Sequence, residues 1–421
     1  QRPTDDLAAV TPPAPPTEPR LRPWDALRFR DYRFLWGTGL LVVISLWMRI
    51  LATSQWLFDE TGSEAVLGLI GLVQLFVQIP ALLWGGAVAD HLDRKKVMLG
   101  AQMGTFGVLL ALGFMSGAGV LEPWHVYTAI GITAASQMVS NPAAAALAPA
   151  TVPQRYLMHA ITTTTATQNV GMIIGPLLFA AIVNVSGLTA AFYVAAAVTL
   201  PSALLPQLIG VAGRAAEATA GSTLARMKGG FFYVVRHPIL PGLFLLDTGI
   251  TVVSFYREIL PALVRGLFQG GATATGILGA ANSTGAVVGS VVALFFAEFQ
   301  AKGMLVLYAS LAYGIFLFGF SSFSMLWVGV IFIALIGGAD SVTVAVRHTT
   351  VQLTTPDNMR GRAHSFMVLS ATTANNIGTL WVGIWAEVIG ARETMFMGAI
   401  LAVVAAVAVG RIWRPIREYR G

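Results

Sequence analysis

The stretch GGAVADHLDRKK, residues 85–96, ends one long apolar segment of the chain and begins another. Its charged residues are Asp90, Asp93, Arg94, Lys95 and Lys96, and an apolar segment of hydrocarbon-spanning length flanks them on each side. A soluble protein has little use for such a charged loop between two apolar segments of this length. The stretch therefore indicates two membrane-spanning helices joined by a short loop.

Composition extends this expectation to the whole chain. The 421 residues are 56% hydrophobic and 11% charged, with a mean hydropathy of +0.71, more apolar than a typical soluble domain. Apolar segments of about 20 residues recur, and helices are the form in which such segments satisfy their own backbone in lipid. We expect twelve spans, centred near Leu46, Phe76, Leu109, Ile132, Ile173, Ala196, Val252, Val287, Leu311, Val330, Thr373 and Ala402.

The basic residues predict the orientation, since Lys and Arg in short loops stay cytoplasmic. With twelve spans and a cytoplasmic N-terminus, the only basic residues in the outer loops are Arg265 and Arg392. The first outer loop, DETGSEA from Asp59, is acidic. We expect a multi-pass protein of the cell's inner (plasma) membrane with both termini in the cytoplasm. The cytoplasmic basic residues are Arg20, Arg22, Arg28, Arg30, Arg33, Arg94, Lys95, Lys96, Arg155, Arg226, Lys228, Arg236, Lys302, Arg360, Arg362, Arg411, Arg414, Arg417 and Arg420.

Several function classes find no support. The net charge of +6 follows from the positive-inside bias, so it calls for no nucleic-acid partner. The chain has no cysteine, and its six histidines are scattered, so we expect no disulfide, no metal site and no cofactor. No nucleophile–base pair or phosphate loop indicates an enzyme. The proline-rich start shows no cleavable signal peptide and is expected to be disordered.

Internal similarity predicts two duplicated halves. Shifting the sequence by about 208 residues places LGLIG at 67–71 on TGILG at 275–279, Asp90 on Glu298 and Arg49 on Arg257. We expect a disordered tail at 1–32, six-helix bundles at 33–210 and 239–412 joined by a cytoplasmic linker at 211–238, and a C-terminal tail at 413–421.

Two motifs connect the chain to a known family. Gly86, Asp90, Arg94 and Lys95 resemble the loop between the second and third spans of the major facilitator superfamily, with Asp93 where many members have glycine. GGADSVTVAVRHTTVQLTTPDNMRGRAHSF at 337–366 resembles its enterobactin-exporter-like (drug:proton antiporter) branch. With Asp247, the resemblance covers most of the chain after Phe29. It implies an all-α membrane protein of twelve helices in two pseudo-symmetric six-helix bundles.

Arg49 and Arg257 are the central candidates for substrate binding. Each is expected inside the first helix of its half, where an arginine marks a functional site by default. The resemblance places these two helices across a central cavity, where guanidinium groups would bind carboxylate or phosphate. Two other readings stay open: pairing with Glu258 or Asp247 as a packing device, and snorkelling to the outer interface. Tyr256 belongs to the same candidate site.

Three carboxylates are candidates for proton coupling: Asp340, Asp247 and Glu258. A carboxyl group in low dielectric can load and release a proton near neutrality. Arg347 is expected to snorkel to the cytoplasmic interface, and local hydrogen bonding is the alternative role for Asp340. Many drug antiporters carry a coupling arginine in the fourth span, which this chain lacks. The notable polar groups there are Gln137 and Asn141, which we add to the substrate candidates.

The signature loop is expected to act as a conformational latch. The resemblance places Asp90, in its Gly86 motif with Arg94 and Lys95, near the start of the eleventh span, where Arg360 and Arg362 could bind it. A plain topology anchor is the alternative. In the fifth span, Gly171, Gly175 and Pro176 resemble an antiporter signature and predict close helix packing with a bend.

These features predict a proton-coupled exporter of a small organic solute that is siderophore-like, drug-like or anionic, working by alternating access. A lipid or lysolipid flippase on the same scaffold is the alternative, and a non-transporting membrane sensor is a third class. The expected partners are the solute, protons and the lipid bilayer, and we expect a monomer.

Overall fold

The computed structural model describes residues 22, 24–213, 223–296 and 299–419, except for the side chains of residues 83–91, 223–226 and 358. Within these residues the regular structure is helical, as expected, with no strand. The side chains of Asp90 and Glu298, and the surroundings of Gly86, therefore lie outside the described residues. Of the expected disordered tail at 1–32, residues 1–21 and 23 also lie outside them, whereas Asp25–Arg28 form the short helix η1 and α1 begins at Arg30, so the expected tail extends too far into the chain.

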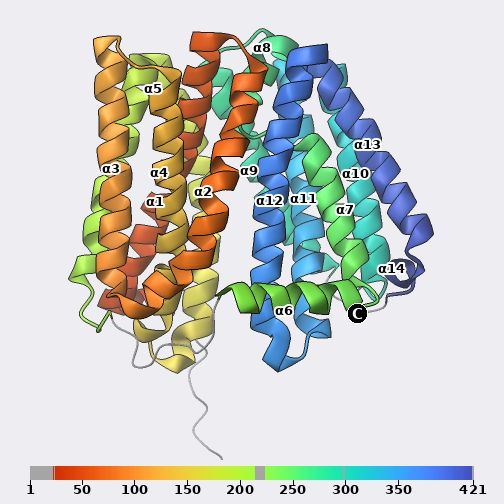
Figure 1. Cartoon of the computed structure of the whole chain (residues 1–421), viewed down its shortest axis with the longest axis horizontal. Coiled ribbons are helices and arrows are strands. Elements are labelled where there is room, and N and C mark those ends of the chain that lie inside the picture. Colours follow the sequence, from red (N-terminus) through yellow and green to blue (C-terminus); the bar gives the residue numbers. More distant parts are fainter. Residues whose placement is uncertain (1–21, 23, 214–222, 297–298, 420–421) are drawn as a thin grey trace, which may run out of the picture.

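The helices form two halves that stand side by side (Figure 1). The first half consists of α1 (Arg30–Thr61), α2 (Glu64–His91), α3 (Arg94–Ala118), α4 (Pro123–Leu147) and α5 (Leu157–Leu204), with the short helices η1 (Asp25–Arg28), η2 (Ala148–Ala150), η3 (Gln154–Tyr156) and η4 (Leu205–Leu208). After α6 (Thr223–Arg236), the second half consists of α7 (Leu240–Ser254), α8 (Leu260–Phe268), α9 (Ala272–Phe295), α10 (Lys302–Ser322), α11 (Leu326–Thr354), α12 (Asp357–Ile389), α13 (Ala391–Ile412) and α14 (Arg414–Glu418).

Eight helices in the described part are long and apolar enough to cross a membrane, or nine if the bent pair α6–α7 counts as one span. The helices α4 and α12 are not among them, although they are 25 and 33 residues long. All twelve expected span centres lie in helices. Two of them, Ile173 and Ala196, share α5, where Gly187 adopts φ 79° and breaks the helix into two arms. Glycine is the residue that tolerates this backbone conformation.

The two ends of the molecule differ in their elements. We call them the α8 end, where α1 ends and α2 begins, and the α6 end, where α1 begins (Figure 1). The helix α6 falls in the expected linker and lies across the α6 end, bent by 107° from α7. Burial lowers the pKa of His237, and its Nδ1 accepts hydrogen bonds from the backbone N–H groups of Ile239 and Leu240 at the start of α7.

Small residues let the two halves touch at two matching seams. Along α2 and α12, a side chain at Gly71 would overlap the Asn376 carbonyl oxygen. Along α5 and α9, a Cβ at Gly276 would lie 2.7 Å from the Pro176 carbonyl oxygen. Gly71 and Gly276 come from the repeated LGLIG and TGILG segments. The sequence repeat therefore supplies the two contact lines between the halves.

Candidate functional site

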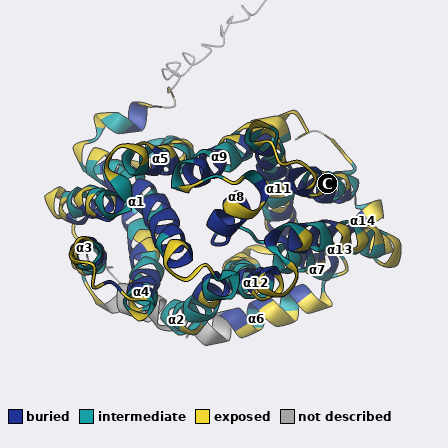
Figure 2. Ribbon diagram, turned by 90° about the horizontal axis from the view of Figure 1, so that it is seen from above, coloured by how far each residue is buried: buried dark blue, intermediate teal, exposed yellow. Residues whose placement is uncertain are grey.

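A cavity of about 220 Å³ lies in the second half, and Trp47 of α1 contributes to its wall. Seen from above, α8 occupies the centre of the ring of helices (Figure 2). Its residue Leu260 also lines the cavity. The polar and charged lining residues are Asp247, Thr251, Tyr256, Arg257, Asn282, Ser310, Tyr313, Asp340, Thr343, Arg347 and Asn375.

A break in the seventh span positions Tyr256, Arg257 and Glu258. The helix α7 ends at Ser254 and α8 begins at Leu260, so these residues lie on a non-helical turn. The expectation that Arg257 lies inside a helix was therefore wrong. The Asn282 amide donates a hydrogen bond to the Tyr256 hydroxyl. Non-helical backbone at membrane depth is tolerated where it is buried in protein or lines a cavity.

Arg257 faces the cavity between two aromatic rings. Its guanidinium carbon lies 5.2 Å from the ring centre of Trp47 and 5.1 Å from that of Phe255. Trp47 belongs to the first half, so Arg257 is held by both halves at once. The Asp340 carboxylate, on α11, lines the same cavity and interacts electrostatically with Arg257. Cation–π contacts of this kind favour a charged guanidinium.

Arg49 sits beside the cavity but does not line it. Its side chain is 6% exposed, and its electrostatic partner is Glu258, which is 4% exposed. Glu258 also interacts with Arg257 and accepts a hydrogen bond of 3.2 Å from the Thr379 hydroxyl. The two arginines therefore share one carboxylate. This arrangement is the pairing alternative for Arg49, whereas Arg257 retains a face toward the cavity.

Asp247 is paired with Arg347, not with Arg257. The Arg347 guanidinium, on α11, forms an ion pair with the Asp247 carboxylate of α7. Arg347 is 7% exposed and lines the cavity, so the expectation that it snorkels to the interface was wrong. Its Nε makes no hydrogen bond to any described residue. The cavity lining thus has two arginines balanced by two aspartates, Asp247 and Asp340.

The remaining substrate candidates lie elsewhere. Gln137 and Asn141, on α4, are not among the cavity lining residues. The neutral polar groups that do line it, such as Asn282, Tyr313 and Asn375, come from the second half. Sequence reasoning missed them, although Asn375 begins the segment NNIG at 375–378, which a shift of about 207 residues places on QNVG at 168–171. No group of three or more potential metal-binding side chains is found within the described residues.

The described part of the signature loop is tied to its own half. Asp93 caps α3 by accepting a hydrogen bond of 2.9 Å from the Lys95 N–H, which gives a role to the residue that departs from the family pattern. Arg94 and Lys95 donate to the carbonyl oxygens of Ala146 and Ile209.

The partners expected across the interface also have local contacts. Arg360 forms an ion pair of 2.7 Å with Asp357, and Arg362 packs against Gly229 of α6. The Asp90 side chain lies outside the described residues, and the latch stays a prediction.

The glycine motif of α5 packs against α1 and α9. Gly171 lies against Leu40 and Val43, and a Cβ at Gly175 would lie 2.8 Å from that of Trp47. Pro176, on the same helix, contacts Gly279 of α9. These contacts hold α1, which carries Trp47 and Arg49, beside the cavity in the second half of the molecule.

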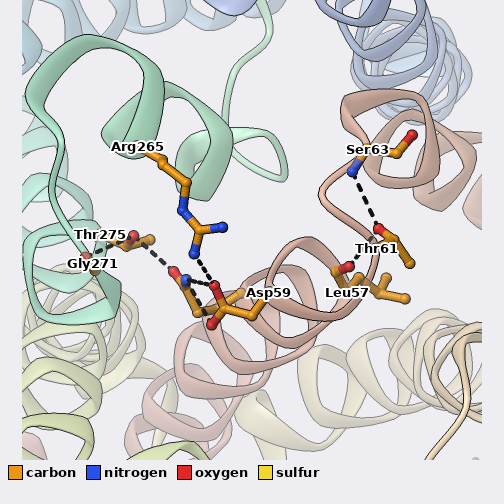
Figure 3. Close-up of polar contacts among 8 residues, drawn as sticks. Leu57, Asp59, Thr61, Ser63, Arg265, Gly271 and Thr275 are labelled. Carbon is orange, nitrogen blue, oxygen red and sulfur yellow. Dashed lines mark hydrogen bonds and ion pairs between the residues drawn. The ribbon is translucent and has the colours of Figure 1, made fainter.

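The halves are joined by polar contacts at the α8 end. In Figure 3, Arg265 of α8 reaches Asp59 of α1 in an ion pair, and Asp59 also accepts hydrogen bonds from the Gln55 amide. The Thr275 hydroxyl donates to Gln55 Oε1 over 2.9 Å. The Arg265 guanidinium also lies 4.9 Å from the ring centre of Phe58. This group bridges α1 to α8 and α9.

A second bridge joins α12 to the start of α2. The Glu387 carboxylate of α12 accepts hydrogen bonds of 2.7 Å from the Ser63 hydroxyl and 3.0 Å from the Ala65 N–H. An acidic group at this position stabilises the N-terminus of α2, because the helix dipole is positive there. The bridge is the counterpart, at the opposite end, of the contact expected between Asp90 of α2 and the start of α12.

Comparisons with known proteins identify relatives over most of the chain. A family model described as "Transmembrane secretion effector" matches residues 21–419. The enterobactin exporters EntS of Shigella boydii serotype 4 and Escherichia coli O81 are each 28% identical over 365 residues, covering 84% of this chain and 84% of theirs.

Solved structures share the fold. The nucleoside transporter NupG superposes with a TM-score of 0.74 at 14% identity, covering 92% of this chain and 99% of its own. A peptide transporter of the POT family, solved with alafosfalin, gives a TM-score of 0.76 at 11% identity, covering 93% and 95%. The matched family and relatives are transporters, not enzymes.

Proposed function

Since the chain belongs to the transmembrane secretion effector family of the major facilitator superfamily, we propose that this membrane transporter exports a small organic solute in exchange for protons. The relatives named as enterobactin exporters support export as the direction. The observation that carries the proposal is the cavity in which Arg257 and Asp340 interact beside the broken span. Broken helices that expose charged groups at mid-membrane are typical of transporter binding sites.

The charge balance of the cavity supports a solute with both acidic and hydrogen-bond-donating groups. Arg257 offers a fork for a carboxylate or a similar group, and the Asp340 carboxylate accepts a hydrogen bond or a cation. Arg49, which is held by Glu258 outside the lining, positions the turn that carries Arg257 and does not contact the solute. The sequence suggested that Arg49 and Arg257 both bind the solute. This assignment leaves Arg257 as the one binding arginine.

Asp340 is the proposed proton carrier. The carboxylate binds either a proton or a donor group of the solute, and this competition makes the two occupy the site alternately. Export then follows because the proton enters from the outside as the solute leaves. Asp247 is a weaker candidate, since Arg347 already compensates its charge. Glu258 is held by Thr379 and two arginines, which favours a structural role over proton release.

Alternating access requires the halves to separate at one end at a time. Four hydrogen-bonded contacts described above join Gln55, Asp59, Ser63 and Ala65 of the first half to the second half at the α8 end. A fifth lies nearer the middle of the molecule, where the Asn376 amide donates to Gln78 Oε1 over 2.9 Å. We assign the α6 end to the cytoplasm because Arg94, Lys95, Lys228, Arg236, Arg360 and Arg362 gather there. On this assignment the described contacts belong to an inward-facing state, closed outside.

The test is transport by the purified protein in liposomes. A pH gradient is imposed, and a panel of acidic, basic and amphoteric solutes is assayed for proton-driven movement. We expect a solute that moves against its gradient with the wild-type protein and Glu60→Gln, an exposed control, but not with Asp340→Asn. Gradient-independent movement of every solute in the panel would contradict proton coupling.

A flippase on the same scaffold fits less well. Its substrate would need an apolar path open to the bilayer, whereas the cavity is lined by two arginines and two aspartates. Scrambling of labelled lipid in the same liposomes, at a rate that Asp340→Asn leaves unchanged, would favour it over solute export.

A further inference from the structure

A second pocket lies at the α6 end, where α11 finishes and α12 begins. It measures about 500 Å³ and presents polar side chains from both helices. His348 and Gln352 stand one turn apart on α11, and Arg360 and His364 stand one turn apart on α12. The rings of the two histidines lie edge to face with centroids 6.4 Å apart.

The lining of this second pocket carries one fixed positive charge, on Arg360, and no negative charge among its described residues. Its described residues include Arg360 and the two histidines but no carboxylate. Asp357 pairs with Arg360 from outside the lining, and its side chain is 87% exposed. Arg347, at the edge of the central cavity, interacts electrostatically with His348. Such a set of donors favours an anion.

The residues that line the second pocket lie on the same two helices as residues that line the central cavity. On α12, Arg360, His364 and Met367 follow helical spacing that continues to Ala371 and Asn375, which line the central cavity. On α11, His348 directly follows Arg347 of the central cavity. A solute entering from the α6 end along this stripe would meet the second pocket first.

We propose that the second pocket binds the acidic group of the solute, a carboxylate or phosphate on an organic body, before the solute enters the central cavity. Arg360 supplies the fixed charge, and His348, His364 and Gln352 supply hydrogen-bond donors. Val351 and Met367 give the organic part an apolar wall. The assignment rests on the proposed transport function and specifies it, since it makes an acidic group a requirement for entry.

Labelling of a single cysteine tests the proposal. The chain has no cysteine, so Leu353→Cys places a unique, exposed thiol at the pocket. The purified full chain in phosphatidylcholine nanodiscs is reacted with a maleimide, with and without saturating benzoate. We expect benzoate to slow labelling by roughly fivefold or more. Benzyl alcohol, the uncharged analogue, should leave the rate unchanged.

The pocket variants decide the result. Arg360→Gln with His364→Gln should abolish the protection, Arg360→Lys should keep part of it, and Arg236→Gln, an exposed arginine at the same end, should keep all of it. Equal labelling with and without benzoate, or protection that survives the double variant, overturns the proposal. Protection by phosphatidylglycerol nanodiscs alone, with none from benzoate, assigns the site to a lipid headgroup and also overturns it. Labelling needs no transport, so the protection by benzoate can be measured even if the transport assay fails. Failure of this proposal and failure of the proposed function can therefore be told apart.

Discussion

Arg49 and Arg257 occupy equivalent positions in the two sequence halves but differ in what they can do. Arg49 is buried in a continuous helix, and Arg257 lies on a break, between two aromatic rings, where it faces the cavity. The repeat predicted the pair correctly as positions. It could not predict the asymmetry, because that depends on where the seventh span stops being helical.

The asymmetry predicts that the two arginines fail differently when they are replaced. Arg49→Met leaves Glu258 buried with one cation fewer, which should destabilise the protein by about 3 kcal/mol. Arg257→Gln should abolish solute binding, whereas Arg49→Met should keep it in the protein that remains folded. Thermal unfolding and solute binding, measured on both variants in detergent, separate the two effects. Adding Glu258→Gln to Arg49→Met should recover part of the stability.

If both single arginine variants lost solute binding equally and kept their stability, both arginines would instead bind the solute. In that case Arg49 would have to reach the solute in a state other than the one described.

At the element scale, the long apolar segments predicted the helices, because each needs only its own hydrophobicity and hydrogen bonds. All twelve expected centres fall in helices. The break at Phe255 was missed because the apolar residues around Val252 predict one continuous span, which we expected to include Arg257. The usable signal was Pro261, because proline is favoured in the first turn of a helix and so marks the start of a new one.

The seam between α2 and α12 predicts that a larger residue at Gly71 blocks closure of the α8 end. The added side chain of Gly71→Leu would overlap the Asn376 backbone, and overpacking of 1–3 kcal/mol corresponds to a loss of transport of about tenfold. Gly100→Leu, at an α3 position with open space around it, is the matched control. Transport by both variants is measured against the amount of folded protein. Full activity of Gly71→Leu would mean that this seam is dispensable.

The bridge from Glu387 to the start of α2 predicts a shift in the conformational equilibrium. Glu387→Ala removes a cap worth about 1 kcal/mol, enough for a roughly fivefold shift toward separation of the halves at the α8 end. Spin labels on cysteines introduced at Glu60 and Gln269 report this separation as a longer distance.

Glu122→Ala is the control for the Glu387 bridge, because Glu122 caps α4 within one half. It should lower stability without changing the distance between the labels. An unchanged distance distribution in Glu387→Ala would show that the bridge does not hold the α8 end closed.

At the scale of the whole molecule, the repeated segments supply the two contact lines between the halves. The charged loops make the two ends of the molecule different. Composition and periodicity predicted the class and the helices, and the resemblance of two motifs to a known family predicted the family. The site was predicted only in part. Asp247, Asp340 and Arg257 were found as intramembrane charges, but the Asp247–Arg347 pair depends on how α7 and α11 pack. Gln137 and Asn141 were chosen by polarity, which does not say which half holds the cavity.

The central claim is that the solute and a proton compete for Asp340. It is tested most directly by proton release on binding, measured with a pH indicator in weakly buffered detergent solution, near neutral pH, as the identified solute is titrated into the purified protein. By linkage, we expect up to about one proton released per solute bound for the wild-type protein and none for Asp340→Asn. Solute binding without proton release in the wild type across the neutral range, or equal release from the Asp340→Asn variant, would contradict the account.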